Sequence, residues 1–213
     1  MDERSIIPRF KLNRGILFCY NIIMLARTHQ IIGITAGVGY YLAVAEPTYG
    51  PATFAAVIIA SSIGSLLPDL DQPTAKIWDS IPYIGHSVGK ASAPFFKHRS
   101  FLHSILGMLI FGWLVSRLLQ TFPEYWGISI YPVFICFIIG YITHLIADMF
   151  TVEGIPLLFP WQRMIGLPPK PFEGARIMTG KWFENLVLFP IINIMLMIII
   201  ITHLNQIKSI LFK

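Results

Sequence analysis

Four short stretches of the chain combine histidine and aspartate residues beside long hydrophobic runs. They are Thr28-His29-Gln30, Pro68-Asp69-Leu70-Asp71, His98-Arg99-Ser100-Phe101-Leu102-His103 and Thr143-His144-Leu145-Ile146-Ala147-Asp148. Ionisable groups next to hydrocarbon are costly unless they are paired or bind a metal ion. His144 and Asp148 are four residues apart, so on a helix they share a face and can bind one ion together. We therefore expect the four stretches to meet in one metal site.

The ligand types indicate which metal the site would bind. Imidazole with carboxylate suits zinc, manganese or iron better than calcium, which prefers shells made only of oxygen. The candidate ligands exceed what one four-coordinate zinc requires, so we expect one to three divalent ions, with zinc favoured and manganese as the alternative. The expected ligands are His29, Asp69, Asp71, His98, His103, His144 and Asp148.

Two metals, or one metal with acid–base groups, would suit hydrolysis of a phosphoester. Such a site activates a water and stabilises both oxygens of an in-line displacement at phosphorus. We expect Asp69 or Asp71 to act as a bridging ligand or base, and Arg99 to bind a phosphoryl oxygen. A phospholipid is one candidate substrate.

Each of these residues also has an ordinary structural explanation. A histidine such as His29 can cap a helix, the aspartates of the second stretch can end one, and His144 with Asp148 can form a buried hydrogen-bonded pair. His86, in a Gly/Ser loop, and His203, at the far end of the last hydrophobic segment, are not expected in the site.

The composition is that of a helical membrane protein. Of the 213 residues, 55% are hydrophobic and 13% are charged, against about 25% charged residues in soluble domains. The net charge of +5 comes from scattered basic residues rather than a dense patch, so we expect a lipid bilayer and no nucleic acid as partner. The two cysteines, Cys19 and Cys136, indicate neither disulfides nor a cysteine zinc site.

Hydropathy predicts an all-α fold with about five transmembrane helices. The expected spans are 29–45, 52–67, 101–119, 131–150 and 186–203, separated by long polar loops at 68–97 and 151–185. Small residues in the second span suit close helix packing in lipid. The apolar patch 15–26 is too short for a bilayer, which needs ~20 residues. We therefore divide the chain into a basic tail (1–27), one membrane domain (28–204) and a short tail (205–213).

The distribution of basic residues predicts the orientation. With the N-terminus in the cytoplasm, only Arg117, Lys208 and Lys213 of the 16 lysines and arginines fall outside, which agrees with the positive-inside rule. All seven expected ligands then lie at the cytoplasmic face. A transporter would place such ligands near the bilayer midplane, so we favour a hydrolase. A metal or proton transporter and a non-catalytic protein with a structural metal remain the alternatives.

The four stretches, together with Gly154-Ile155-Pro156-Leu157-Leu158-Phe159-Pro160, resemble the YdjM family of bacterial inner-membrane proteins. Members are described as membrane-bound, metal-dependent hydrolases, and the resemblance covers roughly residues 24–190. It implies a helical membrane fold in the bacterial inner membrane and metal-ligand roles for the seven residues given above.

The resemblance extends to the segment 179–184, which implies a catalytic role for its acidic residue, Glu184. Gln72, Ser100 and Leu102 depart from the family pattern, and a histidine missing at position 72 lowers the expected metal count. The order of histidines and aspartates is also similar to that of zinc-dependent phospholipases C and P1-type nucleases, which implies phosphodiester cleavage.

Overall fold

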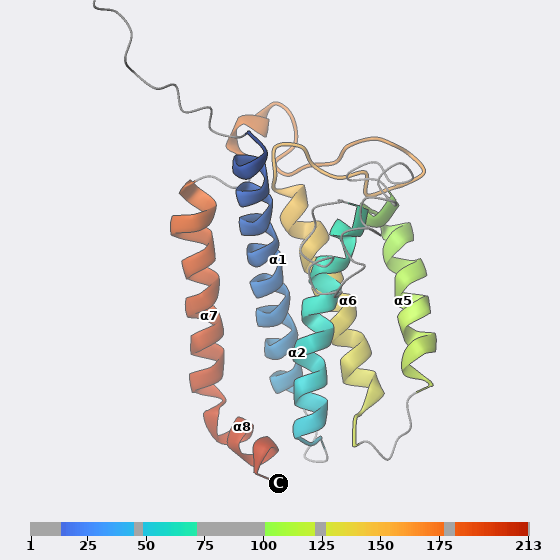
Figure 1. Cartoon of the computed structure of the whole chain (residues 1–213), viewed down its shortest axis with the longest axis vertical. Coiled ribbons are helices and arrows are strands. Elements are labelled where there is room, and N and C mark those ends of the chain that lie inside the picture. Colours follow the sequence, from blue (N-terminus) through green and yellow to red (C-terminus); the bar gives the residue numbers. More distant parts are fainter. Residues whose placement is uncertain (1–13, 45–48, 72–100, 122–126, 177–181, 213) are drawn as a thin grey trace, which may run out of the picture.

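A computed structural model describes residues 14–44, 49–71, 101–121, 127–176 and 182–212 of the chain, and within these ranges the fold is helical (Figure 1). The α-helices are α1 (Arg14–Val44), α2 (Pro51–Leu66), α5 (Ile105–Leu119), α6 (Ile130–Met149), α7 (Phe189–Thr202) and α8 (Leu204–Leu211). Shorter turns are η1 (Leu67–Asp71), η2 (Phe101–His103), η4 (Phe172–Ala175) and the π-helical η5 (Glu184–Leu188). The described residues form no β-strand beyond one isolated bridge.

Three of these helical segments are long and apolar enough to cross a membrane, namely Pro51–Leu70, Ile130–Met149 and Glu184–Thr202. The 15-residue helix Ile105–Leu119 is apolar but shorter. The long helices α1, α2, α5, α6 and α7 correspond in order to the five predicted spans and run alternately up and down the bundle (Figure 1). The predicted all-α membrane fold is therefore confirmed.

The core of the bundle is the mutual packing of α1, α2 and α6. Two glycines allow α2 and α6 to cross at backbone contact, because a β-carbon at Gly64 would collide with the carbonyl of Phe137 and one at Gly140 with that of Ser61. Small residues at such crossings are the usual means of close helix packing in lipid. Tyr141 is fully buried beside this crossing. Close approach of the backbones thus fixes the position of α6 relative to α2 and to the turn η1 that follows α2.

The first helix corrects one prediction. We expected a span beginning at His29, with a separate apolar patch at 15–26, but the backbone of α1 runs without a break from Arg14 to Val44. The sequence from 16 to 32 contains neither glycine nor proline, so no residue there breaks the helix. His29 consequently lies near the middle of α1, not at its start.

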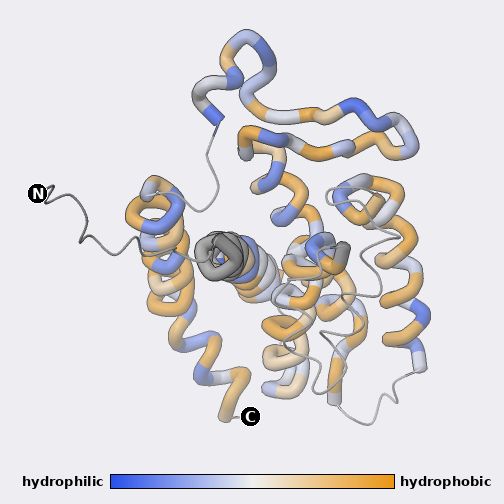
Figure 2. Tube along the Cα trace, turned by 45° about the horizontal axis from the view of Figure 1, so that its top comes forward, coloured by the Kyte–Doolittle hydropathy of each residue, from blue (hydrophilic) through white to orange (hydrophobic). Residues whose placement is uncertain are grey.

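The last helices lie on the outside of the bundle. No residue of α7 is buried, and its surface is apolar along most of its length (Figure 2). The expected C-terminal tail is instead mostly the helix α8, which buries Ile207 and Ile210. Gln206 Nε2 donates a hydrogen bond to the carbonyl of Leu42 at 2.9 Å. Helix α8 therefore lies at the end of the bundle opposite the turns η1 and η2 (Figure 1).

The segment 151–176, which we call the strap, crosses the end of α6 and reaches α5 (Figures 1 and 2). Ile155 and Ile165 exchange two backbone hydrogen bonds of 2.9 and 2.8 Å, and Ile105 N donates to Leu157 O at 3.0 Å. Arg176 donates to the carbonyls of Val152, Gly166 and Pro168 at 3.3, 3.1 and 3.0 Å. One guanidinium thus ties three points of the strap together.

Replacing Arg176 with methionine should loosen the strap. Losing three hydrogen bonds to a charged donor should lower the local opening free energy by about 2 kcal/mol, because water competes for part of their strength. Amide hydrogen exchange at Ile155 and Ile165 should then quicken roughly 30-fold. Lys170→Met is the control, since the side chain of Lys170 is 81% exposed and its ammonium lies 3.7 Å from a carboxylate oxygen of Glu173. Unchanged exchange in Arg176→Met would contradict this role.

Candidate metal centre

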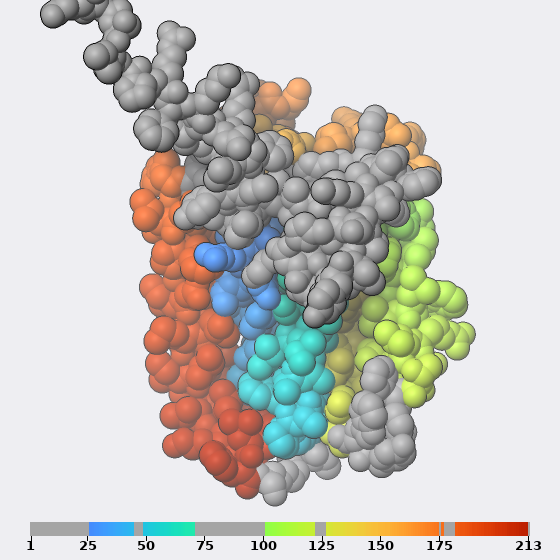
Figure 3. Space-filling view, viewed as in Figure 1, coloured from blue at the N-terminus to red at the C-terminus, as the bar shows by residue number. Residues whose placement is uncertain are grey.

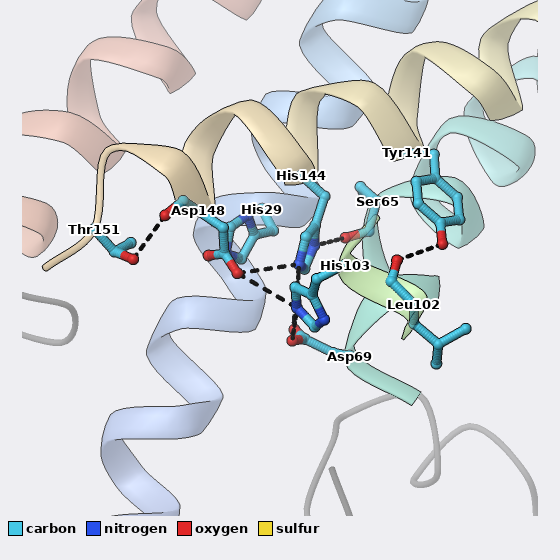
Figure 4. A network of polar contacts seen from close by, with 9 residues as sticks. All are labelled: His29, Ser65, Asp69, Leu102, His103, Tyr141, His144, Asp148 and Thr151. Carbon is cyan, nitrogen blue, oxygen red and sulfur yellow. Dashed lines mark hydrogen bonds and ion pairs between the residues drawn. The ribbon is translucent and has the colours of Figure 1, made fainter. Parts of the chain in front are cut away.

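Four separate segments bring histidine and aspartate side chains together inside the bundle (Figure 4). His29 comes from α1, Asp69 from η1, His103 from η2, and His144 and Asp148 from α6. All five residues are buried, with exposed fractions between 0% and 8%. The turns η1 and η2 and the C-terminal end of α6 lie at one end of the bundle (Figure 1), and His29 reaches them from α1. The predicted meeting of the four stretches is thus realised for these residues.

Four donor atoms form a compact group at the centre of this cluster. His103 Nε2 and His144 Nε2 are 3.4 Å apart. They lie 3.4 and 3.7 Å from Asp148 Oδ2, and 3.7 and 3.8 Å from Asp69 Oδ1. A tetrahedral ion with bonds of ~2.0–2.1 Å separates its ligand atoms by roughly 3.3–3.4 Å. The distances that join the two imidazoles to each other and to each carboxylate are thus only slightly longer than the edges of a zinc coordination shell, and these residues fit a metal ion.

The orientation of His144 suits metal binding. Its Nδ1 lies 2.7 Å from the carbonyl oxygen of Ser65, at the end of α2. A carbonyl accepts but cannot donate, so Nδ1 carries the proton and Nε2 presents its lone pair to the group of donors. Such a hydrogen bond to the remote nitrogen is the usual way in which a protein fixes a ligating imidazole.

A second possible metal site shares His144 and Asp148 with the four donors described above. His29, His144 and Asp148 could hold a metal ion, as could Asp69, His103 and His144. His29 Nε2 lies 3.2 Å from Asp148 Oδ1, whereas the other oxygen of Asp148 faces His103 and His144. The Nδ1 atom of His29 is buried and makes no hydrogen bond to the described residues. Asp148 is therefore placed between the two groups, with one oxygen toward each.

Neighbouring polar groups hold the ligand-bearing turns in place. Tyr141 donates from its hydroxyl to the carbonyl of Leu102 at 2.6 Å, which anchors η2 and so positions His103. Ser104 Oγ accepts from Gly107 N at 3.1 Å and caps α5. The sequence prediction missed these supports. The signal for Tyr141 was its place three residues before His144 on the buried face of α6.

Access to the donor group is greatest beside Asp69. The side chain of Asp69 is 12% exposed, whereas those of His103 and His144 are 0% exposed. Pro68, which precedes Asp69, is fully buried, and the turn η1 packs against η2 and α6. The cluster is thus a buried site with one slightly exposed carboxylate.

The structure places the remaining predicted residues as follows. Glu184 is buried at the start of η5, which packs against α1, the helix that carries His29. Asp71 ends η1, but its side chain lies outside the described part, as do His98 and Arg99. His203 ends α7 at the opposite end of the bundle, as expected. Sequence reasoning thus found the five clustered residues, and the structure leaves the roles of the others as predictions.

Comparison with known proteins supplies the family. A family model described as YdjM inner membrane protein matches residues 24–207. The chain is 30% identical over 145 residues to the inner membrane protein YdjM of Escherichia coli (strain K12), covering 68% of this chain and 70% of that protein. It is 32% identical over 168 residues to the uncharacterized protein YvsG of Bacillus subtilis (strain 168), covering 78% and 88%. No solved structure matches the chain. Because the family model spans most of the chain, this protein belongs to the YdjM inner membrane protein family.

Proposed function

We propose that this protein is a metal-dependent hydrolase that cleaves a phosphoester at the membrane. The observation that carries the proposal is the pair of three-ligand groups that share His144, all of them buried. Buried imidazoles and carboxylates in this combination suit zinc, with manganese as the alternative. When bound, one such ion, or a pair of them, would act as a Lewis acid and lower the pKa of a coordinated water to near neutrality.

The chain's own residues would divide the remaining work. His103, His144, Asp69 and Asp148 would hold one ion, and His29 with the other oxygen of Asp148 would supply two of the ligands of a second. Asp69 is the carboxylate best placed to accept a proton from water, because its side chain is the most exposed of the central four donors. In the reaction, water forms a new P–O bond, the ester P–O bond breaks, and a proton from water ends on the leaving oxygen.

Roles for the other predicted residues follow from the same proposal. Arg99 and His98 adjoin the segment that carries His103, so Arg99 could bind a phosphoryl oxygen and His98 a metal ion. Asp71 would add a ligand or base two residues after Asp69. The positive-inside distribution of basic residues supports an N-terminus in the cytoplasm and a site at the cytoplasmic face of the bacterial inner membrane.

Changing Asp148 to asparagine should abolish hydrolysis. The amide keeps the size of the side chain but removes the negative charge that faces both groups of metal ligands. Activity on a chromogenic phosphodiester should therefore fall at least ~100-fold. This is the largest loss expected when only the outer shell of a metal site is disturbed. Metal content of the detergent-purified protein should be measured on the same samples by elemental mass spectrometry. Glu173→Gln, a half-exposed acid in the strap, is the matched control.

The outcomes of this experiment separate the hydrolase from its alternatives. Bound metal with hydrolysis lost only in Asp148→Asn supports the proposal. Stoichiometric metal without hydrolysis of phosphomonoesters or phosphodiesters would indicate a structural metal. Absence of both metal and activity from wild-type protein purified without chelators would refute the mechanism.

A further inference from the structure

A groove of about 290 Å³ lies between α1 and α7. Its walls are lined by Ile32, Ala36 and Gly39 from α1, and by Ile192, Met195 and Ile199 from α7. The volume is at the lower end for ligand sites, which hold ~300–1,000 Å³, and it suits a slender aliphatic group. Thr35 and Tyr40 also line the groove, but Thr35 already donates its hydroxyl to the carbonyl of Ile31 at 2.7 Å. The lining is almost wholly apolar, so a polar molecule would lose its hydrogen bonds there.

The groove is continuous with the lipid-facing surface of the molecule. Helix α7 buries none of its residues, and in space-filling view it stands along one edge of the protein beside α1 (Figure 3). Exposed apolar side chains such as Ile194 and Ile198 cover this edge. For a helix of a membrane protein this surface faces lipid, so acyl chains of the bilayer are the molecules that meet the groove.

Both walls of the groove lead toward the end of the bundle that holds the candidate metal centre. On α1, Ile32 is three residues beyond His29, which is ~4.5 Å along the helix axis. On the other wall, the π-helical turn η5 precedes α7. Glu184, the first residue of η5, lies eight residues before Ile192, which is about two helical turns, and α1 packs against both η5 and α7. The buried Glu184 and His29 therefore mark the same end of the groove.

We propose that this groove binds an acyl chain of a membrane phospholipid and directs its phosphate toward the metal centre, so that the substrate is a lipid-borne phosphoester. This inference rests on the proposed hydrolase function and specifies its substrate class. The apolar groove selects the chain, and the imidazole and carboxylate groups at its end meet the headgroup. A chain held between α1 and α7 also keeps the ester at the depth of the site while the reaction occurs.

The test fills the groove without disturbing the helices. A β-carbon at Gly39 would meet only Ile199 Cδ1, at 3.4 Å, so Gly39→Leu extends into the groove without a backbone clash. Ala55→Leu is the matched control, because it adds the same side chain to an exposed position of α2. The probe is phosphatidylethanolamine that carries a diazirine in one acyl chain, photolysed in vesicles with each protein and mapped by peptide mass spectrometry.

We expect crosslinks at α1 and α7 positions of the groove in wild type and Ala55→Leu, and at least a five-fold reduction in Gly39→Leu. We also expect kcat/KM for long-chain phosphatidylethanolamine to fall about ten-fold in Gly39→Leu, with no change for a short-chain, water-soluble phosphodiester. Equal crosslinking of all lipid-facing helices, or of Gly39→Leu and wild type, would overturn the groove assignment even if hydrolysis persists. Groove crosslinks in a protein without metal or hydrolysis would instead refute the proposed function alone.

Discussion

Replacing His144 with alanine should eliminate metal binding by both ligand groups. His144 is the residue that the two groups share, and its Nδ1 proton is directed to the carbonyl of Ser65. Loss of an outer-shell partner alone costs ~10–100-fold in metal affinity, so loss of this ligand should exceed 100-fold. Elemental mass spectrometry should find stoichiometric metal in the wild type and almost none in the variant.

A stability measurement separates loss of metal from loss of fold. Metal at 100 times its Kd stabilises a folded site by ~2.7 kcal/mol, so added zinc should raise the Tm of the metal-depleted wild type but not that of His144→Ala. The variant should also be less stable without metal, since Ser65 loses its hydrogen-bond donor at a cost of about 1–3 kcal/mol. His203→Ala, at the other end of the bundle, is the control. A zinc-dependent rise in Tm in His144→Ala would contradict the shared-ligand assignment.

Substituting Gly64 with alanine should destabilise the bundle and weaken metal binding together. A β-carbon at Gly64 would collide with the backbone carbonyl of Phe137 on α6, and a carbonyl within a helix cannot move aside as a side chain can. Overpacking of this kind costs ~1–3 kcal/mol. Because Ser65 follows Gly64 and accepts the His144 hydrogen bond, separation of α2 from α6 also displaces the ligand turn that carries Asp69.

Thermal unfolding in detergent and metal titration should be measured on the same preparation. We expect a lower Tm for Gly64→Ala and a metal affinity reduced at least ten-fold, an effect comparable to disturbing a ligand's outer shell. Gly174→Ala is the control, because a β-carbon at Gly174 meets no atom within 4 Å. A Gly64→Ala protein with wild-type Tm would show that α2 and α6 do not pack at backbone contact.

Hydropathy predicted most helices well, because a bilayer requires long apolar runs with all backbone groups hydrogen-bonded internally. The predicted spans 52–67 and 131–150 differ from α2 and α6 by one residue at each end. The start of α1 was wrong because polar residues at 27–30 were taken to end the apolar segment. In the bundle, His29 faces other buried polar groups instead of lipid. The amphipathic helix α8 was missed because only eight residues form it.

The candidate site was predictable in its residues but not in their division of roles. The spacing of His144 and Asp148 indicated a shared helix face, and in the structure their side chains lie 3.7 Å apart on one face of α6. The sequence could not show that Asp148 turns one oxygen toward His29 and the other toward His103. That arrangement depends on the crossing of α1 and α6, which local pattern does not specify. Ser65 was also missed, because its backbone carbonyl, and not its side chain, contacts His144.

The continuous helix α1 has a consequence for the biosynthesis of this protein. His29 enters the membrane with the first helix, yet its partner Asp148 leaves the ribosome 119 residues later. Until α6 has been inserted, the α1–α2 hairpin carries a polar side chain for which lipid provides no partner. Docking of α6 therefore removes an energetic penalty left by earlier insertion, and a chain truncated before α6 retains it. We therefore expect the α1–α2 hairpin to reach its final packing only after α6 has been synthesised and inserted.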